Sequence, residues 1–180
     1  ITPDEFDRAQ AIVTAMKAHP EARQLLTGGQ KEKTIIQERR RGLLPLKARL
    51  DIHHPGQRLV GELKTIHDIN QIKATMERYH YPLSAAFYRE LVKGQSVIFI
   101  FVQTGEPFDV VVFELSRLQL QEGHELMTIK LQQFDECWTT HHWPEAPPTP
   151  EFDDDPLMMP FMPMNPNRQR YDLPVGELTL

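Results

Sequence analysis

Apolar residues recur at three- to four-residue spacing in the first part of the chain, which is the period of an amphipathic helix. This pattern begins after Thr2 and Pro3, a suitable helix start, and continues until His19 and Pro20 interrupt it. We expect His19 to be the C-terminal residue of this helix. The short segment EARQLL follows and ends before two glycines, so the sequence predicts a second, shorter helix there.

Three segments with the two-residue alternation of strands come next. Their sequences are KTIIQER, LLPLKARLDI and RLVGELKT, which cover residues 33–39, 43–52 and 58–65. The connections RRRG and HHPGQ each contain a glycine, which can adopt the positive φ that a tight turn requires. The sequence therefore predicts three strands in a meander.

Helical spacing returns at Asp68 and gives way to strand patterns further along the chain. It predicts one helix over about residues 69–76 and another over about 83–91, with Pro82 in its first turn. QSVIFIFVQ and FDVVVFEL, separated by TGEP, have the composition of strands packed on both faces. A long helix over about residues 117–143 follows. This order predicts an α/β (α+β) fold with a mixed central β-sheet flanked by helices.

The composition changes near the end of the chain, where nine of the fifteen prolines and four of the seven methionines lie between Pro144 and Leu180. This stretch contains three consecutive aspartates and the segment PLMMPFMPMNP, with no pattern of an independent core. We predict one domain over residues 1–144 and a Pro/Met-rich extended tail over residues 145–180. The tail is either a flexible extension or a peptide that docks on another subunit or protein partner.

The overall composition agrees with one globular domain, since 40% of the 180 residues are hydrophobic and 25% are charged. A net charge of −5 argues against a surface that is basic throughout, but it permits a local basic groove. Cys137 can form no internal disulfide and favours a reducing compartment, although a small buried residue is its simpler interpretation. No apolar run is long enough to span a bilayer, and the first residues do not resemble an export signal, so we expect a soluble, cytoplasmic protein.

The strand RLVGELKT carries two charges that its alternation does not require. Glu62 and Lys64 are two residues apart, so they share one face of the strand while Leu63 points to the other. The HHPGQ hairpin brings Asp51, near the end of the preceding strand, alongside them. Two carboxylates, an ammonium group and the Leu63 carbonyl suit Mg²⁺, which prefers oxygen ligands, and the hydrolysis of a phosphodiester. An ordinary surface strand with a Glu/Lys pair is the alternative.

The stretch LDIHHPGQRLVGELKT resembles the core of the PD-(D/E)XK nuclease superfamily. Its wider context resembles the RecE-type exodeoxyribonuclease VIII branch, in which the first acid also precedes the E-x-K pair by eleven residues and two helices follow. The resemblance covers about residues 1–144 and is strongest over residues 32–92. It implies a restriction-endonuclease-like core with Mg²⁺ (or Mn²⁺) as the cofactor.

The same resemblance implies roles for individual residues. Asp51, Glu62 and the Leu63 carbonyl would hold the metal, and Lys64 would position or activate the attacking water. Glu32, nineteen residues before Asp51, matches the family's upstream acid and is a further metal ligand, unless it is a solvated strand end.

One departure from the family's pattern lies in the segment YPLSAAFY. It has Ser84 where the family has a glutamine, and a hydroxyl cannot make the bidentate contact of an amide. Tyr88, with its neighbours His80 and Tyr81, either compensates by contacting DNA or belongs to ordinary packing and surface.

A second departure concerns the family's helical N-terminal portion, whose histidine lies near the metal and has no counterpart here. We expect that this portion lies outside the sequence or that the site is completed in another way. His53 and His54 stand next to Asp51 in the hairpin turn, but adjacent residues point in different directions, so turn residues are favoured over metal ligands.

Basic residues along the first hairpin offer a path for the DNA backbone. Three arginines occupy the RRRG turn, and two more basic residues share a strand face with Asp51. Phosphate contacts need no base preference, which suits a degradative nuclease; a solvated hairpin tip is the alternative. The predicted DNA-binding residues are Arg39, Arg40, Arg41, Lys47, Arg49, Ser84 and Tyr88.

These features together predict a Mg²⁺-dependent exonuclease that degrades one strand of linear double-stranded DNA for recombination, with 5′ to 3′ polarity implied by the resemblance. A catalytically incomplete nuclease-fold module, which binds DNA and docks a partner through its tail, is the alternative, and an endonuclease of the same superfamily is a third possibility. The expected partners are DNA ends, a single-strand annealing protein and further copies of the chain, with no membrane. The expected location is the cytoplasm of a bacterium or a phage-infected host cell.

Overall fold

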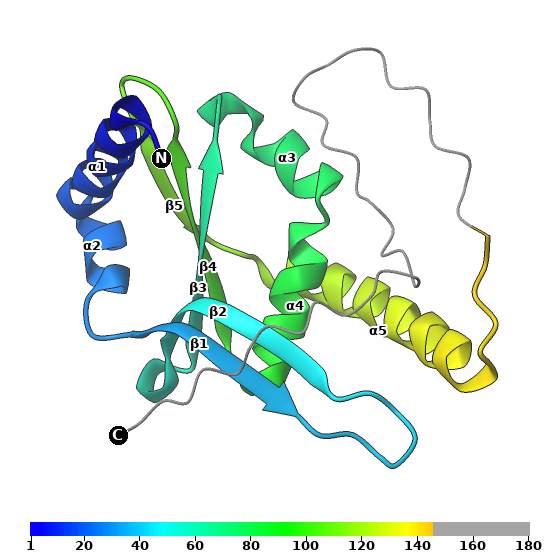
Figure 1. Cartoon of the computed structure of the whole chain (residues 1–180). Helices are drawn as coiled ribbons and strands as arrows, with labels where there is room; N and C mark the ends of the chain where they lie inside the picture. The colour runs from blue at the N-terminus through cyan, green and yellow to red at the C-terminus, as the bar shows by residue number, and fades with distance from the viewer. Residues whose placement is uncertain (146–180) are drawn as a thin grey trace, which may run out of the picture. The chain divides into compact units, whose positions relative to one another are not determined.

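The chain folds around a five-stranded sheet with the strand order β1–β2–β3–β4–β5 (Figure 1). The computed structural model describes residues 1–145. The strands are β1 (Gln30–Gln37), β2 (Leu46–His54), β3 (Leu59–Ile66), β4 (Ser96–Gln103) and β5 (Val110–Glu114). Strands β3 and β4 run parallel, and the other neighbouring pairs are antiparallel. The predicted mixed sheet is therefore confirmed.

Helices cover both faces of the sheet. The first two lie on one face, and the last three lie on the other (Figure 1). They are α1 (Pro3–Ala18), α2 (Pro20–Leu26), α3 (Ile72–Arg78), α4 (Tyr81–Leu91) and α5 (Arg117–Thr140). Two short 3₁₀ turns, η1 (Pro55–Gln57) and η2 (Ile69–Gln71), precede β3 and α3.

The two layers of helices enclose two hydrophobic clusters, one on each face of the sheet. Alternate residues of β4 contribute to both clusters. Phe99 and Phe101 pack towards α3, α4 and α5. Ile100 and Val102 pack towards α1 and α2. All four side chains are buried. The prediction that this strand is packed on both faces is therefore correct.

The start of the chain shows how local sequence signals set the helix ends. Thr2 and Glu5 form a reciprocal capping box at the start of α1. His19 is the C-cap of α1, as predicted, and it also caps α2, because its Nδ1 accepts a hydrogen bond from the Ala22 backbone N–H at 3.3 Å. One residue thus ends one helix and begins the next.

Several predicted boundaries differ from the structure, and two of them have a clear local cause. Strand β5 begins at Val110 rather than Phe108, because Phe108 has a φ of 58° and donates its N–H to the Gly105 carbonyl at 2.8 Å, which extends the turn. Helix α5 ends at Thr140, before His141 with a φ of 57°. The predicted tail lies, from residue 146 on, outside the described residues. Within the described part of the chain, no helix has the length and apolar character to cross a membrane.

Helices α4 and α5 cross at a point where one of them has no side chain. A Cβ atom on Gly123 of α5 would lie 2.1 Å from the carbonyl oxygen of Pro82 in α4. Backbone atoms cannot move aside as the end of a flexible side chain can. The short distance between the helices therefore depends on Gly123, and with it the position of α4 against the sheet.

We predict that Gly123→Ala lowers the free energy of unfolding by about 3 kcal/mol, because the added methyl group forces α4 and α5 apart. Chemical denaturation of the two proteins measures this change. Gly105→Ala is the matched control, since a Cβ there meets no atom within 4 Å, and its effect should stay within about 0.5 kcal/mol. Equal stability of Gly123→Ala and the unsubstituted chain would contradict the close crossing.

Candidate active site

Strands β2 and β3 pair over only three residue pairs before they separate. The pairs are Ile52 with Gly61, His53 with Val60 and His54 with Leu59. After Gly61, β3 is paired only with β4. The part of β2 that precedes Ile52 is paired only with β1. A gap therefore opens between the two strands at the positions where the sequence analysis placed its charged residues.

Gly61 forms the last of these pairs and allows the strands to meet closely there. A Cβ at this position would lie 3.1 Å from the Cβ of Ile52, tighter than ordinary van der Waals contact. The residue therefore marks the point from which the two strands diverge.

Asp51 closes the gap with its side chain. Its Oδ2 accepts a hydrogen bond from the Leu63 backbone N–H at 2.8 Å. This bond takes the place of the strand ladder that is missing between β2 and β3. Because the N–H and the carbonyl of a strand residue face the same edge, the Leu63 carbonyl also faces this gap.

Glu62 is buried under the helices that cover this face, with only 3% of its surface exposed. Its Oε2 accepts a hydrogen bond from Lys64 Nζ at 2.9 Å. Its Oε1 is buried and has no hydrogen-bond partner. The alternative of an ordinary surface strand is therefore wrong, because Glu62 is not at the surface. An unsatisfied carboxylate oxygen is also rare inside a protein.

The surroundings of Glu62 change its affinity for a proton. Burial raises its pKa to about 7; the positive charge of Lys64 opposes this shift, and the negative charge of Asp51 adds to it. Burial disfavours the charge on Lys64, but the carboxylates of Glu62 and Asp51 outweigh it and raise the pKa of Lys64. Lys64 therefore remains an ammonium group at neutral pH.

Helix α4 presents one face to this group of charges. Tyr81, Ser84 and Tyr88 are spaced by three and four residues, so they lie on the same side of the helix. Lys64 Nζ lies 5.4 Å from the centre of the Tyr81 ring, a cation–π contact. Burial, together with the charge of Glu62, raises the pKa of Tyr88. From the sequence, Tyr81 is grouped with Tyr88 as either a DNA contact or ordinary packing, and the three- and four-residue spacing could have indicated that they share a helix face.

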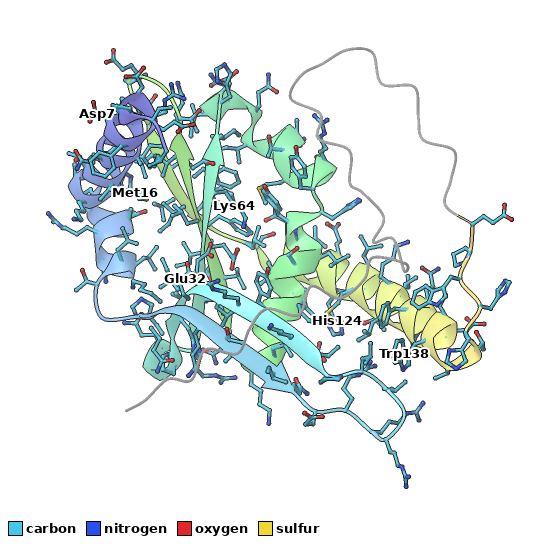
Figure 2. The ribbon with its side chains drawn as sticks, viewed as in Figure 1. Asp7, Met16, Glu32, Lys64, His124 and Trp138 are labelled. Atoms are coloured by element: carbon cyan, nitrogen blue, oxygen red, sulfur yellow. The ribbon has the colours of Figure 1, made fainter. Side chains whose placement is uncertain are left out.

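Glu32 lies at the edge of the site but has a partner of its own. Register along β1 and β2 places it opposite Asp51, yet this pair is missing from the ladder, because Glu32 adopts a left-handed φ of 51°. Its carboxylate accepts from Arg49 Nε at 2.6 Å, and both side chains are more than half exposed. Glu32, Asp51 and Leu63 line the same hollow of ≈ 420 Å³. Lys64 comes from β3, which lies on the other side of β2 from β1 (Figure 2).

The donor set in the gap suits a hard divalent cation. Asp51 and Glu62 each supply a carboxylate, and the Oε1 atom of Glu62 has no partner. The Leu63 carbonyl faces the gap beside Asp51. Among the described residues, no three or more histidine, cysteine, aspartate or glutamate side chains are arranged to hold a metal. Two carboxylates and a carbonyl nevertheless fit Mg²⁺, which binds through few protein oxygens and keeps several waters.

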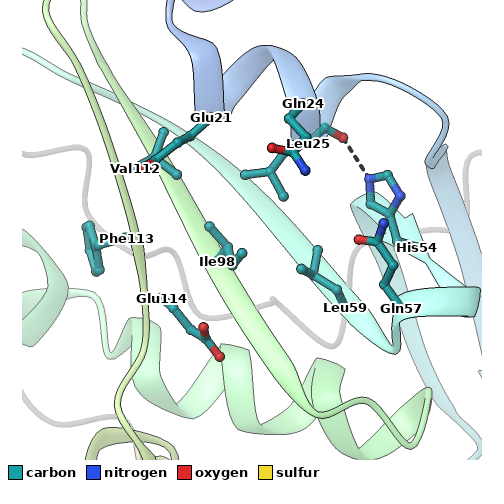
Figure 3. Close-up of a pocket in the computed structure, with 10 residues that line it drawn as sticks. All are labelled: Glu21, Gln24, Leu25, His54, Gln57, Leu59, Ile98, Val112, Phe113 and Glu114. Carbon is teal, nitrogen blue, oxygen red and sulfur yellow. Dashed lines mark hydrogen bonds between the residues drawn. The ribbon is translucent and has the colours of Figure 1, made fainter.

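His53 and His54, at the end of β2, lie in surroundings that differ from those of the charged residues. His54 is buried, and its Nε2 donates to the Leu25 carbonyl at 2.8 Å, which ties the end of β2 to α2 (Figure 3). Burial, helped by the neighbouring charges of His54 and Lys33, lowers the pKa of His53. The apolar pocket beside His54, ≈ 290 Å³ in volume, is lined by none of Asp51, Glu62 and Lys64, so the charged residues do not meet there.

The basic residues among the predicted DNA-binding residues fall into two groups. Arg39 forms two hydrogen bonds with Asp135 of α5, one of them 2.6 Å long, and these side chains are 16% and 19% exposed. This pair anchors the β1–β2 hairpin to α5. Arg49 is paired with Glu32, as described above. The remaining basic residues are exposed at the turn and on the outer face of β2, namely Arg40, Arg41 and Lys47.

Residues 1–149 match the model of a family described as "PDDEXK-like domain of unknown function (DUF3799)". A search of curated proteins finds no match. Among solved structures, the chain is similar to a presumed exonuclease from Eubacterium rectale, with a TM-score of 0.65 and 16% identity over 77% of this chain and 55% of that one. A phage-related exonuclease from Haemophilus somnus 129PT has a TM-score of 0.47 and 13% identity, over 74% of this chain and 71% of that one. The chain thus spans about half the length of the first structure, with which it shares its fold.

The raised pKa of Glu62 leads to a prediction about stability in the presence of a chelator. The pKa of this carboxyl group is about 7 in the folded chain and about 4.3 in the unfolded chain. As pH rises, the unfolded chain therefore loses the proton at a lower pH than the folded chain. Stability should therefore fall as pH rises from 5 to 8, by on the order of 3 kcal/mol from this group. Glu62→Gln should lack this fall, as measured by denaturation at each pH. Glu77→Gln, at an exposed position, should behave like the unsubstituted chain, and equal pH profiles for all three proteins would contradict the burial cost.

Proposed function

Because the chain belongs to the PDDEXK-like family DUF3799, we propose that it is a metal-dependent DNA exonuclease. The observation that carries this proposal is the meeting of Asp51, Lys64 and a buried Glu62 with an unpartnered oxygen, where β2 and β3 separate. Acids and a lysine held together in a strand gap suit phosphodiester hydrolysis, because that reaction concentrates negative charge on the phosphate oxygens.

The proposed metal is Mg²⁺ (or Mn²⁺), held by Asp51, Glu62 and the Leu63 carbonyl, with Glu32 as a further ligand. When bound, such an ion supplies positive charge to the phosphate oxygens in the transition state. The chain prepares its ligands in advance, since the Leu63 N–H orients Asp51 and the Lys64 ammonium group orients Glu62.

Lys64 acts in this proposal as a donor rather than as a base. Its raised pKa keeps the ammonium group charged, so the amine has no lone pair with which to take a proton at neutral pH. Of its three N–H donors, one goes to Glu62, which leaves donors to hold the attacking water and to stabilise the charge that develops on the phosphate. The Tyr81 ring beneath the amine restrains its position.

The exonuclease part of the proposal is supported by the name of the similar structure from Eubacterium rectale and by the resemblance to the RecE-type branch. That resemblance also leads us to propose 5′ to 3′ degradation of one strand of linear duplex DNA for recombination. It further suggests additional copies of the chain and a single-strand annealing protein as partners, in the cytoplasm of a bacterium or a phage-infected cell.

A nuclease-fold module that binds DNA without cleaving it is the second candidate. Two observations favour it over an active enzyme. Glu32, which the family resemblance makes a metal ligand, is held by Arg49, and Ser84 stands where the family has a glutamine. This candidate predicts salt-dependent DNA binding and no metal-dependent release of nucleotides.

We predict that the chain releases nucleotides from an end-labelled linear duplex in Mg²⁺ but not in EDTA, and that it leaves circular duplex DNA intact. Lys64→Ala, Asp51→Asn and Glu62→Gln should each lower the rate by at least about 100-fold, because each removes a ligand or a proton donor from the transition state. Lys17→Ala on the opposite layer of helices is the control and should keep full activity. Cleavage at the original rate by Lys64→Ala would exclude the proposed site, and absence of release from the folded chain would favour the binding module.

The two groups of arginines should respond differently to salt. Arg40→Ala and Arg41→Ala should each reduce the slope of log Kd against log salt by about 0.9, since each removes one phosphate contact. Arg39→Ala should leave this slope unchanged and lower the stability of the chain by about 1–3 kcal/mol, because it removes the charged hydrogen bonds to Asp135. Titration of a fluorescent duplex in EDTA at several salt concentrations measures the slopes. A reduced slope for Arg39→Ala alone would contradict this division.

A further inference from the structure

A row of aromatic rings runs from the surface of the chain into its core. Tyr79 stacks on Tyr81 with 5.8 Å between ring centres and 20° between ring planes. Tyr81 stacks in turn on Phe99 at 5.7 Å, and Phe99 stacks on Phe113 at 6.0 Å. Phe99 is buried, whereas Tyr79 is 55% exposed. The row therefore has a rigid inner end and an aromatic ring presented to solvent at its outer end.

The outer ring lies next to the proposed active site. Lys64 Nζ is 5.4 Å from the centre of the Tyr81 ring, and Tyr79 stacks directly on that ring. Tyr79 is thus one ring further from the amine than Tyr81. A base stacked against Tyr79 would therefore be separated from the amine by the two tyrosine rings.

The backbone holds Tyr79 in this position at a cost. Residues two apart on a continuous helix point in different directions and do not stack. Here Tyr79 is the C-cap of α3, and His80 adopts a left-handed φ of 51° before α4 begins at Tyr81. A left-handed conformation is unfavourable for a residue other than glycine. The unfavourable turn is what brings the two tyrosine rings face to face.

We propose that the exposed face of Tyr79 is a stacking site for a nucleobase of the DNA strand whose phosphate lies at Lys64. This inference rests on the proposed function and adds a binding site for the terminal nucleotide. A base that leaves the end of a duplex loses its stacking neighbour, and an aromatic side chain replaces that neighbour for any of the four bases. Such a contact suits an enzyme that degrades DNA of every sequence.

Arg78 adds a positive charge to this site. Its guanidinium carbon lies 5.7 Å from the centre of the Tyr79 ring. A base that stacks on Tyr79 therefore lies beside a cation that can contact the base or its phosphate. The arginine side chain is exposed.

The test uses the whole chain in EDTA, so that binding is measured without cleavage. The probes are two linear duplexes with the fluorescent base 2-aminopurine as the last base at the 5′ end or at the 3′ end, and matched duplexes that lack this base. Binding should change the 2-aminopurine fluorescence at one of the two ends, because the base moves from the duplex stack to a tyrosine ring. Tyr79→Ala should abolish this change and weaken binding about tenfold, whereas Tyr79→Phe and Tyr79→Trp should retain both.

The duplexes that lack the terminal base distinguish a direct contact from a general loss of structure. Removal of the terminal base should weaken binding by the unsubstituted chain about tenfold, and it should weaken binding by Tyr79→Ala little further, since the contact is already lost. Phe6→Ala on α1, where the phenylalanine is 51% exposed, should change neither quantity. The proposal would be overturned if the two losses of affinity, from Tyr79→Ala and from base removal, multiplied when combined. It would also be overturned if Tyr79→Ala left the fluorescence response unchanged.

These results also distinguish failure of the site from failure of the proposed function. A chain that shows the Tyr79-dependent fluorescence change but releases no nucleotides in Mg²⁺ supports the stacking site and overturns the exonuclease. A chain that degrades DNA equally well with alanine at position 79, and binds abasic ends as tightly as intact ones, overturns only the stacking site. A folded chain that binds neither duplex overturns both.

Discussion

The separation of β2 from β3 places the backbone of β3 next to open space, and this separation determines how the charged residues are arranged. A strand in the middle of a sheet normally satisfies its N–H and carbonyl groups on both edges, and an unpaired group inside a protein is costly. Here the carboxylate of Asp51 replaces the missing neighbour of Leu63. A residue needed to complete the backbone hydrogen bonding is therefore also one of the two acids in the gap.

Glu62 adds an electrostatic consequence to this arrangement. A carboxylate that is buried and only half satisfied destabilises the fold, and Lys64 compensates for part of the cost. The remaining oxygen, Oε1, is buried and has no hydrogen-bond partner. At this one side chain the stability of the fold and the proposed chemistry thus oppose each other, which is the usual relation in a site whose groups are prepared before the substrate arrives.

Helices α4 and α5 fix the positions of the elements around the charged residues. Helix α4 carries Tyr81 against Lys64 and is itself fixed by its crossing with α5 at Gly123. The Arg39–Asp135 pair links the far end of the β1–β2 hairpin to the same helix α5. The hairpin that contains β2 and the helix that contacts Lys64 are therefore both positioned by α5, although α5 contributes no acid to the site.

The sequence by itself determined the order of the elements, the faces of the strands and the close approach of the charged residues. These follow from local rules, because alternation in RLVGELKT places Glu62 and Lys64 together and a short hairpin brings Asp51 beside them. Only the tertiary structure decided that Glu62 is buried, that Arg39 pairs with Asp135 across 96 positions, and that Glu32 and His80 take left-handed conformations. Burial and long-range pairing depend on which surfaces come together once the elements pack, and no pattern within a few residues of the chain encodes that contact.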